Sequence, residues 1–462
     1  MIPNNSPWLK QLNRTRQSVP LPDSLLADVA IVGGGIAGIM TAFFTLRETD
    51  LRVILLEADK VAHGATGHNA GQLTSYFERP LADLVSEFGV DLALDGQRSV
   101  ESAWGLIDQV LAEAKIQTPI YRFTGYAGIA TFERLIIQLE NNALRRAGGL
   151  LPETLLVAGN WAELSQIPDK YLGLYSVVPQ PDVLALLETD NPEYIALHSE
   201  QKGCMNSALF TEEVLGYLVA KYGQRFSFFE SSPVKTIQLM SNHAVLKVLQ
   251  NRVITGRVVL CTNGFENFTI QNMVGEEIDT AFHHAIAGRI GYMSGYLEPL
   301  QHPPTAISYH PRTEDCSADP TGECYFYLTR RPHDHEGNGT HNLVCTGGPE
   351  KVLPNQAIYS REDSCSEDIR HRIDVFLRDN YQKHPGQDTE YAFCWHGLMG
   401  YTPNGVRRIG VEPCHSSLLY NLGCNGVGIL PAIFGGQRIA EFLQGKKVAP
   451  SIFDPLDQRC PA

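Results

Sequence analysis

A glycine cluster followed by an acidic residue is the first feature of this sequence whose residue types and spacing suggest chemistry. The cluster is Gly33-x-Gly35-x-x-Gly38, and Glu57 follows 57 − 38 = 19 residues later. Glycines at this spacing allow a tight turn and let backbone N–H groups approach a pyrophosphate at the start of a helix. An acid at that distance accepts hydrogen bonds from a ribose diol. The pattern predicts a dinucleotide site and leaves open whether FAD or NAD occupies it.

The surrounding residues must form a strand, a turn, a helix and a second strand to position this site. Residues 28–33 are apolar and β-branched, which is typical of a buried parallel strand. Residues 39–47 are apolar and small, as in a buried helix, and residues 52–57 predict a second strand that ends in the acid. This is a β-α-β unit of about 30 residues. The polar segment before residue 28 is expected to lie on the surface.

A loop of small and polar residues follows the second strand. Residues 63–72 read His-Gly-Ala-Thr-Gly-His-Asn-Ala-Gly-Gln. This stretch resembles the one that follows the ribose acid in the D-amino-acid oxidase/sarcosine oxidase superfamily of FAD enzymes. The matching positions are Gly64, Thr66, His68, Asn69 and Gly71.

Further motifs of the same superfamily follow in its order along the chain. They lie at residues 203–209, 232–234, 259–264, 395–404 and 421–429. Together with the first strand they extend from residue 28 to residue 443, and the set is much more specific than the glycine cluster alone.

The resemblance implies a mixed fold, α/β with α+β, in which a Rossmann-like FAD-binding domain is interleaved with an antiparallel-sheet substrate domain. The FAD-binding domain is expected to comprise residues 1–118, 205–280 and 386–462. The substrate domain is expected to comprise residues 119–204 and 281–385. The β-rich patterns near 120–131 and 285–350 fit a sheet that roofs the flavin.

The motif positions give the expected cofactor-binding residues. They are Gly33, Gly35, Ile36, Ala37, Gly38, Glu57, Ala58, Thr66, Gly67, His68, Asn69, Gln72, Leu73, Val234, Thr262, Gly264, Gly397, Leu398, Met399, Gly426, Val427, Gly428, Ile429 and Leu430.

The resemblance also implies the reaction, which is transfer of a hydride from a C–H bond, usually beside an amine, to the flavin. Backbone N–H groups of the loop at 426–429 would stabilise negative charge on the reduced ring. In the sarcosine oxidase branch a lysine after this loop binds the substrate carboxylate, whereas this chain has Leu430. That branch attaches FAD through a cysteine where this chain has Gly397, so neither the clamp nor that bond is expected. His68 stands where many relatives have arginine, and it is either a covalent flavin ligand or a histidine bonded to flavin or backbone.

Residues that touch the substrate are harder to read from the sequence. An aromatic wall suits an amine through cation–π contact, and the candidates are Tyr76, Tyr126, Tyr292, Tyr327, Trp395 and His396. Arg289, Arg330 and Arg331 are candidates to pair a carboxylate. The catalytic set that we expect is His396, as a base, with Tyr327 and Arg289.

The net charge and composition of the chain limit the classes of partner that it is expected to bind. The 462 residues carry a net charge of −14, which argues against nucleic acid and anionic membranes. No apolar run of membrane-spanning length and no C-x-x-C pair is present, so no span and no metal site are expected. The ten cysteines are interpreted as thiols of a soluble cytoplasmic protein.

The expected function is therefore FAD-dependent oxidation of a C–N bond in a small amine or amino acid, with oxygen or a carrier as electron acceptor. The alternatives are oxidation of a 2-hydroxy acid or polyol phosphate, an FAD that is purely structural, and an NAD-only dehydrogenase.

Overall fold

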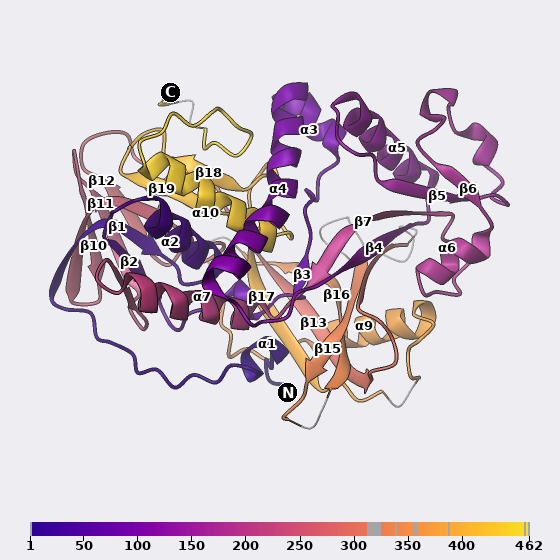
Figure 1. Ribbon diagram of the computed structural model, residues 1–462, viewed down its shortest axis with the longest axis horizontal. Helices are drawn as coiled ribbons and strands as arrows, with labels where there is room; N and C mark the ends of the chain where they lie inside the picture. Colours follow the sequence, from indigo (N-terminus) through magenta and orange to yellow (C-terminus); the bar gives the residue numbers. More distant parts are fainter. Residues whose placement is uncertain are drawn as a thin grey trace.

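Two β-sheets dominate the computed structural model (Figure 1). It describes residues 2–311, 325–337, 340–354, 358–386, 389–456 and 459–460. The helices are α1 (Pro7–Lys10), α2 (Ile36–Glu48), α3 (Leu81–Phe88), α4 (Val90–Ala114), α5 (Phe132–Ala147), α6 (Gln180–Leu186), α7 (Ser207–Tyr222), α8 (Asp279–His283), α9 (Glu367–Asn380) and α10 (Ile429–Leu443). The mixed α/β class predicted from the sequence is confirmed.

The first sheet has a parallel centre with the order β12-β9-β10-β11-β1-β2-β8, and β19 pairs with β11 and β18. Its strands are β1 (Ser24–Val32), β2 (Val53–Leu56), β8 (Phe226–Phe229), β9 (Val234–Leu239), β10 (Ala244–Val248), β11 (Asn251–Leu260), β12 (Thr269–Asn272), β18 (Arg408–Val411) and β19 (Leu418–Leu422). The predicted β-α-β unit is β1, α2 and β2.

Both faces of this sheet are covered, which explains the continuous apolar runs in its strands. Val29 and Ile31 of β1 pack into one buried cluster with α2, α4, α7 and α10, while Ala30 and Val32 pack into a second with β9 and β10. Helix α10 lies against α2, and a Cβ on Gly436 would approach the Met40 carbonyl carbon to 2.7 Å. This tight packing fixes the start of α2, where the dinucleotide motif lies.

The second sheet is mostly antiparallel and has the order β17-β13-β16-β15-β14-β4-β7-β5-β6, with β3 paired to β7. Two pairs, β14 with β4 and β5 with β6, are parallel. Its strands are β3 (Gln72–Leu73), β4 (Tyr121–Ile129), β5 (Thr154–Ala158), β6 (Ser176–Val178), β7 (Ala196–Cys204), β13 (Ala287–Pro299), β14 (Thr305–His310), β15 (Phe326–Asp334), β16 (Thr340–Val352) and β17 (Phe393–Tyr401). Strand β17 belongs to this sheet, although the expected domain division put residues 386–462 with the cofactor.

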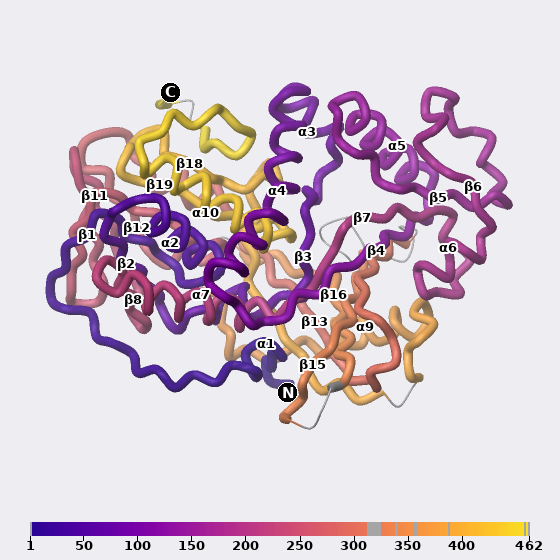
Figure 2. Tube along the Cα trace, in the orientation of Figure 1, coloured from indigo at the N-terminus to yellow at the C-terminus, as the bar shows by residue number. Residues whose placement is uncertain are grey.

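The N-terminal segment does not lie only on the surface as expected. Figure 2 follows it from β1 back to α1 near the N-terminus, and Asn5 forms an isolated antiparallel bridge with Cys394 of β17. Trp8 of α1 is 0% exposed, its indole N–H donates to the Asn69 carbonyl at 2.5 Å, and its ring meets Trp395 edge-on at 6.2 Å. The guanidinium of Arg331 lies 5.1 Å from the Trp8 ring centre. The apolar Trp8 therefore anchors an otherwise polar segment.

The thiol interpretation also needs correction. Cys414 and Cys460 form a disulfide that fastens the C-terminal tail to the turn between β18 and β19. Cys316 and Cys324 lie outside the described residues, and the remaining six cysteines are free thiols.

Candidate cofactor and substrate site

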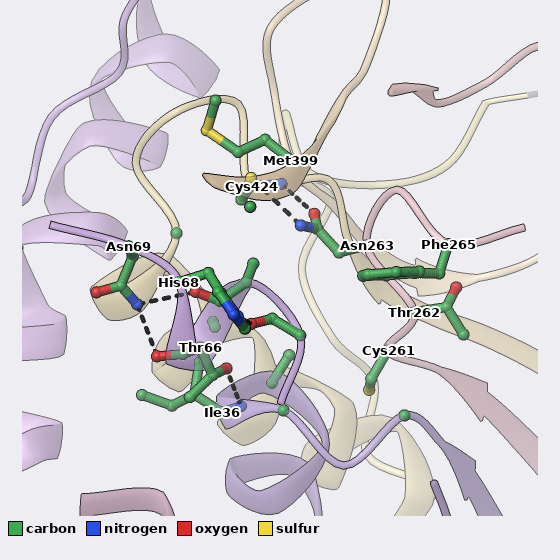
Figure 3. A pocket seen from close by; sticks show the side chains of 18 of the residues that line it. Ile36, Thr66, His68, Asn69, Cys261, Thr262, Asn263, Phe265, Met399 and Cys424 are labelled. Atoms are coloured by element: carbon green, nitrogen blue, oxygen red, sulfur yellow. Dashed lines mark hydrogen bonds between the residues drawn. The ribbon is translucent and has the colours of Figure 1, made fainter. Parts of the chain in front are cut away.

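A cavity of about 660 Å³ runs between the two sheets, within the range of about 300–1,000 Å³ typical of ligand sites. The expected cofactor residues line it, except Gly38, Gly67, Leu73, Gly264, Leu398 and Leu430. The β1–α2 turn, the loop at 57–78, the end of β11, the loop before α10 and strands of the second sheet all contribute. Figure 3 shows side chains from these separate segments converging on one space.

The glycine turn brings backbone close to this cavity. Gly33 has φ 109°, a conformation that favours glycine. Gly38 lies outside the lining because it packs against the strand, and a Cβ there would lie 1.9 Å from the Gly33 carbonyl oxygen. Helix α2 begins at Ile36, so its first turn and positive dipole end face the space where a pyrophosphate would lie.

Glu57 lines the cavity and is held there by two backbone N–H groups. Its carboxylate accepts the backbone N–H of Gly34 at 2.6 Å and that of Asp59 at 2.9 Å. Burial raises the pKa of this carboxyl, although both backbone hydrogen bonds oppose the rise. A buried carboxylate with remaining acceptor positions in a cavity suits the hydroxyl donors of a ribose. Val234 and Ser232 also line the cavity, and the Ser232 N–H donates to the Glu57 carbonyl at 2.8 Å.

The loop after β2 is folded by its own polar side chains. Asn69 donates to the carbonyls of Ala65 and Thr66 at 3.0 and 2.9 Å, and the Thr66 hydroxyl accepts the N–H of Ile36 at 2.9 Å (Figure 3). Asn69 and Thr66 thus shape the loop and join it to the start of α2.

His68 faces the cavity as a neutral imidazole. Its Nδ1 donates to the Gly64 carbonyl at 3.0 Å, which leaves Nε2 as the unprotonated nitrogen. Burial lowers the pKa of His68 to about 4. A Cβ on Gly397 would lie 2.6 Å from the His68 carbonyl oxygen, so the loop and β17 touch through backbone. This contact gives a physical reason for glycine at the position where the sarcosine oxidase branch has its flavin-linked cysteine.

The loop before α10 closes the cavity beside His68. Gly426 has φ 76°, and Asn263 ties the loop to the end of β11 by accepting the Cys424 N–H at 3.0 Å. Helix α10 begins at Ile429, so first-turn N–H groups point toward the cavity. Leu430 is fully buried in the core, and no ligand contact is available at this position.

The far end of the cavity is lined by the second sheet and by the loop that follows β3. Three tyrosines, Tyr76, Tyr325 and Tyr327, line it together with the carboxylates of Glu78 and Glu350. Of these, only Tyr76 and Tyr327 were sequence candidates. Glu78, Tyr325 and Glu350 belong to no recognisable motif, and no signal in the sequence alone identifies them.

The expected catalytic residues do not all meet in this cavity. Tyr327 lines it, and its hydroxyl donates to Met293 Sδ at 3.0 Å. His396 does not, because alternate residues of a strand face opposite sides and Gly397 and Met399 occupy the cavity face of β17. Its Nε2 bonds the Asp363 carbonyl at 2.9 Å and its Nδ1 lies 3.0 Å from the Tyr359 hydroxyl. This position corrects the expectation that His396 serves as the base.

The arginine candidates lie behind the cavity wall. Arg289 is 3.6 Å from the Glu350 carboxylate and its guanidinium stacks 4.3 Å from the Tyr401 ring centre. Arg330 is 0% exposed and pairs with Glu188 through two hydrogen bonds of 2.7 and 2.9 Å. Arg331 lies over Trp8 as described above. Tyr126, Tyr292 and Trp395 also lie outside the lining.

The described part of the chain carries neither a metal-binding cluster nor a membrane-spanning helix. No group of three or more histidine, cysteine, aspartate or glutamate side chains is arranged to hold a metal ion. Within the same residues, no helix is long and apolar enough to cross a lipid bilayer.

The fold and the cavity define a dinucleotide-binding protein in which a second sheet covers the tyrosine-lined end of the cavity. The FAD-dependent oxidoreductase family model, DAO, matches residues 28–442, and the chain belongs to this family. It is an FAD-binding oxidoreductase, which confirms the cofactor predicted from the motifs.

Solved structures agree with the fold. The chain is similar to glycine oxidase from Geobacillus kaustophilus, with a TM-score of 0.63 and 17% identity over 93% of this chain and 98% of that one. It is also similar to L-proline dehydrogenase from P. horikoshii, with a TM-score of 0.66 and 16% identity over 94% and 97% of the two chains.

Sequence relatives match over shorter stretches. Gamma-glutamylputrescine oxidoreductase of Escherichia coli (strain K12) is 37% identical over 73 residues, 16% of this chain and 17% of the relative. Probable oxidoreductase OrdL of Haemophilus influenzae is 30% identical over 139 residues, 29% of this chain and 32% of the relative. Both matches span less than a third of the relative's length.

Proposed function

We propose that this protein oxidises the C–N bond of a small amine or amino acid, with the flavin as hydride acceptor. The observation that carries the proposal is one continuous cavity, which joins the dinucleotide end at Gly33 and Glu57 to a tyrosine-lined end at Tyr76, Tyr325 and Tyr327. The short match to a gamma-glutamylputrescine oxidoreductase supports an amine as substrate.

FAD, when bound, supplies the acceptor for a hydride and its electron pair. Residues of this chain position it: Glu57 would hold the ribose, and the first turn of α2 would face the pyrophosphate. The first-turn N–H groups of α10 and the Gly426 loop would face the pyrimidine edge, where negative charge develops. The imidazole of His68 also lines the cavity and is neutral at neutral pH because burial lowers its pKa to about 4.

The tyrosine-lined end provides a partly dry compartment for the substrate. Burial raises the pKa of Tyr76 and Tyr327 above the usual tyrosine value, so both hydroxyls stay protonated at neutral pH and act as hydrogen-bond donors. Among the described residues that line this end, none is an imidazole that could act as a base, and we propose that the amine to be oxidised loses its proton to solvent or to a neighbouring carboxylate.

Anaerobic reduction of the bound flavin tests the proposal. Amines and amino acids are mixed with the holoprotein in the absence of oxygen, and the loss of flavin absorbance is followed. We expect at least one of these classes to bleach the flavin, because C–N oxidation leaves the electrons there.

Two control ligand classes separate the alternatives. Bleaching by a 2-hydroxy acid or polyol phosphate, with no response to amines, would replace this proposal with C–O oxidation. No bleaching by any class would leave a structural flavin. Turnover with oxygen and with a quinone-like dye then separates an oxidase from a dehydrogenase.

A further inference from the structure

One buried positive charge that lines the cavity has no role in the proposed oxidation. The basic side chains among the described lining residues are Lys235, Arg361 and Arg407. Lys235 is exposed to solvent, and Arg361 pairs with the Asp59 carboxylate at 2.6 Å. Arg407 differs from both, because it is only 6% exposed and its charge therefore needs a partner inside the molecule.

Neutral groups hold the Arg407 guanidinium in place. Its Nε donates to Asn421 Oδ1 at 2.7 Å, and its Nη2 donates to the Asn421 backbone carbonyl at 2.9 Å. Among the described residues, Nη1 has no hydrogen-bond partner and no carboxylate forms an ion pair with this side chain. One amide residue therefore orients the guanidinium without neutralising it.

The acidic groups close enough to act on Arg407 are thiols. Burial lowers the pKa of Arg407 to about 10, and the thiols of Cys424 and Cys261 are the groups that oppose this fall. Burial also raises the pKa of both thiols, to about 12 for Cys261. At neutral pH Arg407 is therefore charged while both thiols are neutral, so no group of the described chain balances the guanidinium.

The residue that anchors Arg407 is shared by the two helices that begin at the cavity. Asn421 Nδ2 donates to the Thr41 hydroxyl of α2 at 3.2 Å and to the Ala432 carbonyl of α10 at 3.1 Å. Each helix directs the positive end of its dipole toward the cavity. Arg407 adds a full positive charge to a part of the cavity that already attracts anions.

The two thiols indicate where along the dinucleotide this charge lies. Cys261 and Cys424, both labelled in Figure 3, line the cavity from the end of β11 and from the loop before α10. The Cys261 carbonyl lies against the β1–α2 turn, since a Cβ on Gly33 would come within 2.6 Å of its oxygen. Arg407 is therefore on the same side of the cavity as the turn that would face a pyrophosphate.

We propose that Arg407 binds the pyrophosphate of FAD and that this contact balances the buried charge of the guanidinium. The pyrophosphate is anionic in both redox states of the cofactor, as a permanently buried cation requires, whereas the flavin ring gains negative charge only on reduction. The planar guanidinium also matches the geometry of phosphate oxygens. The inference concerns the cofactor and does not depend on the class of substrate.

Titration of the apoprotein with FAD and with ADP tests this contact. Arg407→Met replaces the guanidinium with an unbranched side chain that carries no charge. We expect the Kd for FAD and the Kd for ADP each to rise about tenfold to a hundredfold, because a charge-assisted hydrogen bond to phosphate is lost. ADP carries the pyrophosphate without the flavin ring, so its weaker binding assigns the contact to the pyrophosphate. FAD binding is followed by quenching of flavin fluorescence and ADP binding by calorimetry.

Arg408→Met is the matched control. Arg408 is the next residue, at the start of β18, and it is not among the lining residues. This variant changes the net charge by the same amount, and both Kd values should equal those of the wild type. Arg407→Lys keeps a positive charge without the planar fork, so its Kd for FAD should lie between those of the wild type and Arg407→Met.

The remaining outcomes decide against the inference. An unchanged Kd for FAD in Arg407→Met would overturn it. Unchanged ADP binding with a lower midpoint potential of the bound flavin would show that Arg407 acts on the reduced ring and not on the pyrophosphate. An equal loss of FAD binding in Arg407→Lys and Arg407→Met would show that packing, and not charge, is responsible. If Arg407→Met does not fold without FAD, Arg407→Gln, which keeps a donor for Asn421, takes its place in the same comparison.

Discussion

Replacing Gly38 with alanine tests how the β1–α2 turn forms the dinucleotide site. A Cβ at this position would lie 1.9 Å from the carbonyl oxygen of Gly33. A relaxed carbon–oxygen contact needs about 3.3 Å, so the helix start and the turn must separate by about 1.4 Å. Gly33 cannot move away easily, because it is packed against the end of β11. A Cβ on Gly33 would lie only 2.6 Å from the carbonyl oxygen of Cys261.

The cost of Gly38→Ala follows from this displacement. Overpacking in a close-packed region lowers the free energy of unfolding by about 1–3 kcal/mol. A misplacement of about 1 Å in a positioned site typically lowers the rate of the reaction there about a hundredfold. We expect the Kd for FAD to rise about a hundredfold, equivalent to about 2.7 kcal/mol.

The assay is titration of the apoprotein with FAD, followed by quenching of flavin fluorescence. Gly105→Ala is the matched control, since Gly105 is exposed in α4 and no heavy atom lies within 4 Å of its Cβ position. That control should bind FAD normally and gain about 0.5–1 kcal/mol of helix stability. A Gly38→Ala protein that binds FAD as tightly as the control would show that close helix–strand packing does not build the site.

Three further predictions concern charge and burial. Glu57→Gln removes the carboxylate that accepts the Gly34 N–H at 2.6 Å, and the Kd for FAD in the same titration should rise about tenfold to a hundredfold; an unchanged Kd would contradict the ribose assignment. Arg330→Met removes the two-bond partner of the Glu188 carboxylate, which keeps its ion pair with Lys383, and should lower the unfolding free energy by about 1–3 kcal/mol in thermal or urea denaturation; an unchanged unfolding free energy would contradict this pairing. The pKa of His68 falls from 6.5 in the unfolded chain to about 4 in the fold, so between these values the unfolded state binds more protons than the fold. The unfolding free energy therefore decreases by up to about 1.4 kcal/mol for each unit by which the pH is lowered. His68→Gln should reduce that slope by this amount in urea unfolding at several pH values, and an unchanged slope would show that His68 titrates normally.

The dinucleotide end could be predicted from the sequence because its parts are local. The turn at Gly33 and the acid at Glu57 lie within one β-α-β unit, and the roles of each residue follow from backbone geometry that the motif itself dictates. Motifs in order along the chain then identified the family, and with it the two-sheet fold.

The substrate end could not be predicted in the same way. Glu78 lies in a loop, Tyr325 immediately precedes β15 and Glu350 lies in β16, and the pairing of strands in the second sheet brings these distant segments together. His396 illustrates the same limit, because a shift of one residue in strand phase moves a side chain from the cavity to the opposite face. The motif around His396 predicts that this residue lies in a strand, but it does not predict on which face of the sheet the side chain lies.

The burial of Trp8 has a consequence for the order in which the molecule is made. Its indole binding site is formed by the Asn69 carbonyl, Arg331 and Trp395. Trp395 is translated 395 − 8 = 387 residues after Trp8, which takes about 20–80 s at roughly 5–20 residues per second. During translation Trp8 therefore lacks the residues that pack around it in the folded protein. The loop that carries His68 can be fixed between α1 and β17 only after β17 has left the ribosome.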